Sequence, residues 1–271
     1  MKKYFKEVIT HPLFSGSMVM IIGSNSVSFI NYLYHFVMGR MLGPVGYGEL
    51  ASLIAVIGLV GIIPGSVSLL IIKQVSSVKN ELEINNLVGW FKAKIFLASV
   101  IFSISVLVAS PFIASFLNIH KISYLILIAV SFLFSLQSGL YRSILQGILK
   151  FKEMVFSILI ESGAKFILSV FLVYLGFQVG GVMFSLVISA ILGLYITNYY
   201  LRYRPVKNTK SSPHIKPMGV FLIPFAIQSI AVTSLYSSDV ILVKHFFSAH
   251  EAGIYAALST LGKIIFLVRV Q

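Results

Sequence analysis

The sequence predicts an all-α membrane protein with about eight transmembrane helices. Of its 271 residues, 58% are hydrophobic and only 11% are charged, whereas soluble domains average roughly 45–50% and ~25%. The mean hydropathy is +0.95. Several apolar runs also exceed the ~18 residues that mark a membrane-spanning helix. A soluble core could not cover so many apolar segments, so we exclude a soluble fold.

Each predicted span is long enough to cross a ~30 Å hydrocarbon layer at 1.5 Å per residue. The eight spans lie at 13–38, 47–72, 93–117, 122–145, 154–175, 178–200, 218–243 and 252–270. The first span is too long for a cleavable signal peptide and contains polar residues, among them Asn25. We therefore expect it to remain in the mature protein.

The basic residues predict the orientation, because cytoplasmic loops are enriched in lysine and arginine. With a cytoplasmic N-terminus, 15 of the 21 basic residues fall inside, and only Arg40, Lys121 and Lys244 fall outside. The net charge of +13 is then explained by topology and by attraction to anionic headgroups. A nucleic-acid partner is not expected, since the basic residues form no single patch.

The loops predict the domain organisation. The longest hydrophilic stretch, 202–217, is basic, contains three prolines and is typical of a cytoplasmic linker. It separates a six-helix lobe at 1–201 from two further helices at 218–271. All other loops are short, glycine-rich phosphate-binding motifs are absent, and the chain has no cysteine. We expect no metal, no cofactor and no catalytic domain.

Two stretches repeat at a separation of 205 residues. "GRMLGPVGYGELASL" at 39–53 and "FFSAHEAGIYAALS" at 246–259 align Gly48 with Gly253, and each predicts an outside turn followed by a helix. Because six helices separate the copies, both have the same orientation, as in parallel transporter repeats. The alternative is that tight turns simply favour glycine and proline.

Charged residues within predicted spans indicate a cavity, because an ionisable group at membrane depth is costly. Lys165 and Lys263 each lie about eleven residues, or ~16 Å, into a span. Glu161 precedes Lys165 by four residues, so we expect these two to pair on one helical face. Lys263 has no acid on its own helix and needs a partner or an anion. Arg142 either lines the cavity with these lysines, forming a phosphate site, or extends to the headgroups.

Other polar residues in the spans have two interpretations. Asp239 is expected to pair with Lys244 or a residue at the rim, and ion coupling is an alternative role. Asn25, Asn31 and His35 form either interhelical hydrogen bonds or a polar lining for sugar hydroxyls.

The second predicted span contains a weak stretch formed by Gly61, Pro64 and Gly65. Proline removes a backbone hydrogen bond, which predicts a kink that could act as a gate. The two glycines also form G-x-x-x-G, which is typical of closely packed helices.

Two segments carry a family resemblance. "GRMLGPVGYGELASLIAVIGLVGIIPG" at 39–65 resembles the helix 1–2 signature of the oligosaccharide flippase family. This family is the polysaccharide-transporter branch of the multidrug/oligosaccharidyl-lipid/polysaccharide exporter superfamily. "SSDVILVKHFFSAHEAGIYAALSTLGKI" at 237–264 resembles the family's helix 7–8 junction.

The resemblance implies a function and partners. Family members are carriers of two pseudo-symmetric six-helix lobes that move undecaprenyl-pyrophosphate-linked sugar repeat units across the bacterial cytoplasmic membrane, for surface polysaccharides such as lipopolysaccharide. Partners would be that substrate, membrane lipids, and polysaccharide polymerase and chain-length proteins. Since this chain stops in the eighth helix, we expect it to be a C-terminally truncated member.

Alternatives remain open at this point. The substrate could be a peptidoglycan precursor or a cationic drug, although a drug cavity should offer unpaired acids. The chain could be an inactive fragment. A membrane glycan polymerase or glycosyltransferase is disfavoured because the sequence has only eight acidic residues and no sizeable outside loop. We expect a transporter, not an enzyme.

Overall fold

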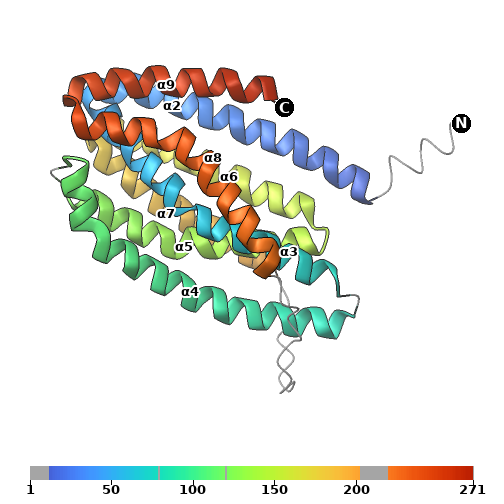
Figure 1. Cartoon of the computed structure of the whole chain (residues 1–271). Coiled ribbons are helices and arrows are strands. Elements are labelled where there is room, and N and C mark those ends of the chain that lie inside the picture. The colour runs from blue at the N-terminus through green and yellow to red at the C-terminus, as the bar shows by residue number, and fades with distance from the viewer. Residues whose placement is uncertain (1–11, 79, 120, 202–218, 271) are drawn as a thin grey trace, which may run out of the picture.

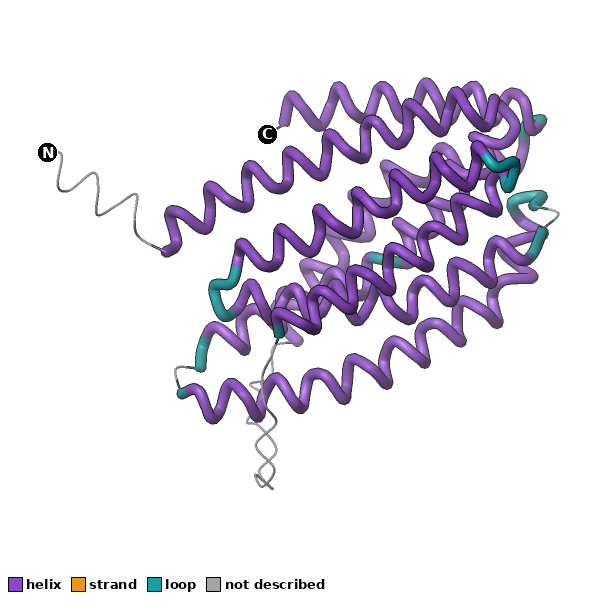
Figure 2. Tube along the Cα trace, turned by 180° about the vertical axis from the view of Figure 1, so that it is seen from behind, coloured by secondary structure: helices purple, strands orange, loops and turns teal. Residues whose placement is uncertain are grey.

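The computed structural model describes residues 12–78, 80–119, 121–201 and 219–270, and all regular structure in these ranges is helical (Figure 1). The predicted all-α class is confirmed. The predicted linker at 202–217 lies outside the described residues. Figure 2 shows the helices side by side in one elongated bundle. Their bounds are α2 Pro12–Val60, α3 Ile62–Ser76, α4 Glu81–Phe116, α5 Ser123–Gly147, α6 Phe151–Tyr174, α7 Gln178–Tyr200, α8 Gly219–Phe246 and α9 Ala249–Val270.

Six described helices are long and apolar enough to cross a membrane by length and composition: α2, α4, α5, α6, α7 and α8. The predicted second span, 47–72, is instead shared between the end of α2 and the 15-residue α3. The predicted eighth span lies within α9. The protein is therefore an all-helical, multi-pass membrane protein.

The first two predicted spans are joined inside α2 by a sharp break at Gly43. This residue has φ 67° and ψ 177°, a left-handed conformation that only glycine adopts readily. Pro44 follows and offers no backbone N–H to continue the helix. Across the break, the ring of Tyr47 lies 3.7 Å from the position of a Cβ on Gly39, so the two helical arms run back beside each other. The turns after α4, α6 and α8 lie at the same end of the bundle, which we call the Gly43 end.

Helix α4 begins twelve residues before the predicted span at 93–117. The side chain of Asn80 caps it by accepting a hydrogen bond from the N–H of Leu82 at 3.0 Å. Glu81 and Glu83 occupy its first turn, where acids suit the helix dipole. Hydropathy alone left this charged turn out of the predicted helix, although its capping residues indicate a helix start.

Helix α7 packs between α5 and α6, and α2 packs against α6 and α9. Two buried apolar clusters lie along the bundle. One includes Tyr34, Leu53 and Met183, and the other includes Ile71, Ile144 and Leu145. This arrangement brings polar groups of α2 beside those of α6 and α9.

Candidate functional site

Lys165 lies where α6 meets the first arm of α2. Its Nζ donates a hydrogen bond to Asn31 Oδ1 at 2.8 Å and lies 4.7 Å from the ring centroid of Tyr34. Within the described parts of the chain, no carboxylate forms an ion pair with Lys165. Its direct described contacts are therefore with neutral groups, a hydrogen bond and a cation–π contact, while the Glu161 carboxylate acts on it from beyond ion-pair distance.

A series of hydrogen bonds runs from the same arm of α2 towards α9. His35 Nδ1 lies 3.2 Å from the hydroxyl of Tyr47. That hydroxyl donates to Thr260 Oγ1 of α9 at 3.1 Å. These hydrogen bonds link both arms of α2 to α9, the helix that carries the second repeat. His35 therefore forms a hydrogen bond between the two arms of α2, which correspond to the first two predicted helices.

The sequence did not predict these contacts of Tyr34, Tyr47 and Thr260. Tyr47 and Thr260 lie in or just after the two repeated segments, which could have indicated a contact. Tyr34 gave no such signal, because aromatic residues are frequent in this chain and mostly pack against apolar neighbours.

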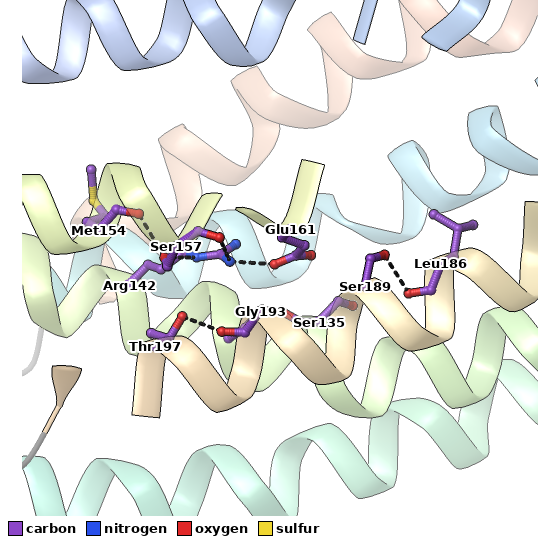
Figure 3. A network of polar contacts seen from close by, with 10 residues as sticks. Ser135, Arg142, Met154, Ser157, Glu161, Leu186, Ser189, Gly193 and Thr197 are labelled. Carbon is purple, nitrogen blue, oxygen red and sulfur yellow. Dashed lines mark hydrogen bonds and ion pairs between the residues drawn. The ribbon is translucent and has the colours of Figure 1, made fainter. Parts of the chain in front are cut away.

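Arg142 of α5 and Glu161 of α6 form a second charged group (Figure 3). Arg142 Nη2 is bonded to Glu161 Oε2, while Nε donates to Ser157 Oγ at 2.9 Å and Nη2 to the Ser157 carbonyl at 3.2 Å. The expectation that Glu161 pairs with Lys165 is wrong in this structure. Arg142 also does not extend to the headgroups, because its side chain is only 13% exposed.

Gly193 of α7 has no side chain, and the ion pair occupies the space that a side chain at this position would fill. A Cβ at this position would overlap the Glu161 carboxylate and lie 3.1 Å from Arg142 Nη2. Figure 3 shows Gly193 beside the pair, on the helix that packs against both α5 and α6. The pair thus depends on a third helix that carries no side chain at the point of contact.

Lys263 of α9 and Asp239 of α8 form a third charged group. Lys263 Nζ lies 2.9 and 3.0 Å from the two carboxylate oxygens and 2.6 Å from the carbonyl of Tyr236. Asp239 also accepts a hydrogen bond from Ser259 at 2.8 Å. Lys263 therefore already has an acid on the adjacent helix, and the expected pairing of Asp239 with Lys244 is wrong.

Two other predicted features differ from the structure. Asn25 is exposed and donates to the carbonyl of Ile21 on its own helix at 2.8 Å, so it does not join helices. The backbone breaks at Gly61, which separates α2 from α3, and Pro64 lies in the first turn of α3, where a missing N–H is tolerated. A Cβ on Gly65 would contact no described atom outside its own helix. Close packing through G-x-x-x-G is therefore wrong.

The two repeated segments touch each other. A Cβ on Gly48 would lie 2.9 Å from the Cα of Gly253, and a Cβ on Gly253 would overlap the carbonyl of Pro44. Residues that align in sequence at a separation of 205 thus form a direct backbone contact between α2 and α9. The contact lies near the Gly43 end of the bundle.

The helical fold and its partly buried charges define a multi-pass, all-helical membrane protein. Comparison with family models gives a match to the family described as "Polysaccharide biosynthesis protein" over residues 13–268. The chain belongs to this family, whose description names polysaccharide biosynthesis.

Comparison with solved structures supports the fold alone. A solved chain described as protein A superposes with a TM-score of 0.68 at 16% sequence identity. The match covers 96% of this chain and 62% of the solved one, so the chain spans less than two thirds of that structure's length. No curated protein matches the sequence.

Proposed function

We propose that this protein is a flippase that moves undecaprenyl-pyrophosphate-linked oligosaccharide across the bacterial cytoplasmic membrane by alternating access. The observation that carries this proposal is the position of Lys165. Its ammonium lies between α2 and α6, with Asn31 and the Tyr34 ring as neighbours and with no described acid as an ion-pair partner. A cation at membrane depth whose direct contacts are neutral is suited to an anionic headgroup.

The charge pairing favours an anionic substrate over a cationic drug. Glu161 and Asp239 already have basic partners, whereas the half-buried Glu49, near the Gly43 end of α2, forms no ion pair within the described residues. A cation would have to displace Arg142 or Lys263 to reach the two paired acids, whereas a phosphate can bind Lys165 without breaking an ion pair. Lys263 would become available to phosphate only if it left Asp239.

The contact between the repeats is the proposed gate at the outside. Gly48 and Gly253 allow the backbones of α2 and α9 to meet, and the hydrogen bonds from His35 through Tyr47 to Thr260 lie beside this contact. Opening this end would separate the two repeats and break the bond between Tyr47 and Thr260. No covalent step and no cofactor is required.

The test is substitution of Lys165 in the chromosomal gene of the producing bacterium. Lys165→Gln removes the charge, and loss of one charge-assisted contact of ~1.5–3 kcal/mol corresponds to a roughly ten- to hundredfold loss of substrate affinity. We expect surface glycan to fall strongly and lipid-linked repeat units to accumulate, at an unchanged protein level in the membrane.

Two controls make this test specific. Lys165→Arg keeps the charge and should retain part of the export. Lys121→Gln removes an exposed cation in the turn between α4 and α5 and should leave export unchanged. Wild-type glycan levels in the Lys165→Gln strain would overturn the assignment of Lys165.

A further inference from the structure

A cavity of about 320 Å³ lies between α2 and α9 near the Gly43 end. Its volume is at the lower end of the roughly 300–1,000 Å³ typical of ligand pockets. Residues from Tyr32 to Arg40 line one wall, and residues from Gly253 to Leu261 line the other. The cavity thus lies between the two segments that carry the repeats.

The mouth of the cavity is apolar. The lining residues Phe36, Leu258 and Leu261 are 46%, 64% and 47% exposed. On the surface of a membrane-spanning bundle, such side chains face hydrocarbon and not water. The hydrogen bonds from His35 through Tyr47 to Thr260 engage polar atoms of the inner wall, and most of the other lining side chains are apolar.

One end of this cavity, which we call the slot, carries a positive charge. Arg40 is exposed, its guanidinium lies 5.0 Å from the ring centroid of Phe36, and no described acid forms an ion pair with it. Among the described residues that line the cavity, none is acidic. Arg40 and Tyr32 are eight residues apart, or about 12 Å along a helix. The slot therefore combines a cation at the rim with an apolar length that matches part of an acyl chain.

We propose that this slot binds an anionic phospholipid, with its phosphate at Arg40 and one acyl chain between α2 and α9. An acyl chain can enter sideways from the bilayer, because the exposed apolar residues open the slot along its length. The lipid contacts both repeats and stabilises the closed contact between Gly48 and Gly253. The site is separate from Lys165, whose ammonium faces Asn31 and Tyr34.

The test uses the full-length protein in phosphatidylcholine vesicles with a trace of phosphatidylglycerol that carries a photoreactive group on its acyl chain. After irradiation, mass spectrometry locates the labelled peptides. We expect labelling within 32–40 and 253–261. A phosphatidylcholine probe should label these peptides several-fold less, since one basic residue near an anionic headgroup corresponds to roughly a fivefold preference.

Two variants probe the two parts of the site. Arg40→Gln should lower phosphatidylglycerol labelling about fivefold, whereas Lys121→Gln should not, although Lys121 is also a cation beside an aromatic ring, that of Tyr124 at 5.9 Å. Ala257→Phe should fill the slot and abolish labelling. Leu235→Phe adds bulk to an exposed face of α8 and should leave labelling unchanged.

Several outcomes would overturn the proposal. They are unchanged labelling in both Arg40→Gln and Ala257→Phe, equal labelling by the two probes, and preferential displacement of the probe by undecaprenyl phosphate, which would assign the slot to the carrier lipid. Lys165→Gln should leave labelling unchanged, so this result is independent of the proposed transport function.

Discussion

At the scale of single residues, charges pair between helices. The spacing of Glu161 and Lys165 favoured a pair along α6, yet the guanidinium of Arg142 reaches Glu161 from α5 and Lys165 bonds to α2. Spacing on one helix is visible in the sequence, whereas the partner on a neighbouring helix depends on packing. The sequence therefore identified the charged residues within the predicted spans, but not which of them pair with each other.

Breaking the pair of Arg142 and Glu161 should destabilise the protein strongly. Glu161→Gln leaves a mostly buried guanidinium, 13% exposed, without its acid, and the loss of a fully buried partner costs about 3–5 kcal/mol. The double variant Arg142→Met/Glu161→Met removes both charges and should recover much of this loss. Thermal unfolding in detergent measures the effect, with Glu83→Gln in the exposed first turn of α4 as the control. A double variant no more stable than Glu161→Gln would contradict this account.

Gly193→Ala tests the space beside that pair. Its new methyl group would overlap the Glu161 carboxylate, and overpacking typically costs ~1–3 kcal/mol. Gly163→Ala on α6, where a Cβ meets no described atom within 4 Å, is the matched control. We expect a lower Tm for Gly193→Ala than for Gly163→Ala, and equal values would contradict the packing.

At the scale of helices, turn chemistry was predictable and exact bounds were not. Gly43 and Pro44 marked the reversal within α2, and the weak stretch around Pro64 marked the break at Gly61. The start of α4 was missed because its charged first turn lowers the hydropathy there. The repeat predicted related segments, but their direct contact is a property of how α2 and α9 pack.

The contact between α2 and α9 gives a graded prediction in a chain without cysteine. Ser52 is fully buried at 0% exposure, so Ser52→Cys should react slowly with a membrane-impermeant maleimide. Gly253→Ala should raise this rate most, because its methyl group would overlap the Pro44 carbonyl. Overpacking of the contact between α2 and α9 by ~1–3 kcal/mol corresponds to a labelling rate up to roughly a hundredfold higher. Gly48→Ala should act less. Gly262→Ala, with no described atom within 4 Å of its Cβ, should not change the labelling rate. Equal rates in the three glycine variants would contradict the proposed gate.

At the scale of the whole molecule, the charge distribution predicts how the bundle lies in the membrane. The exposed residue Lys121 lies just before α5, and the exposed residue Lys152 lies in the first turn of α6, at the opposite end of the bundle (Figure 1). Single cysteines at these positions should differ in labelling of intact cells by an impermeant reagent. Lys121→Cys should react at once, and Lys152→Cys only after permeabilisation. The reverse pattern would contradict the predicted cytoplasmic N-terminus.

The meeting of Gly48 with Gly253 has a consequence for how this protein can vary. Each residue is the counterpart of the other in the repeat, and both already have the smallest side chain. Neither residue can be replaced by a smaller one to compensate for a larger residue at the other position. Any larger residue at either position therefore pushes α2 and α9 apart. In the proposed gate, variation at this junction would therefore shift the balance between closed and open conformations in one direction only, towards the open form.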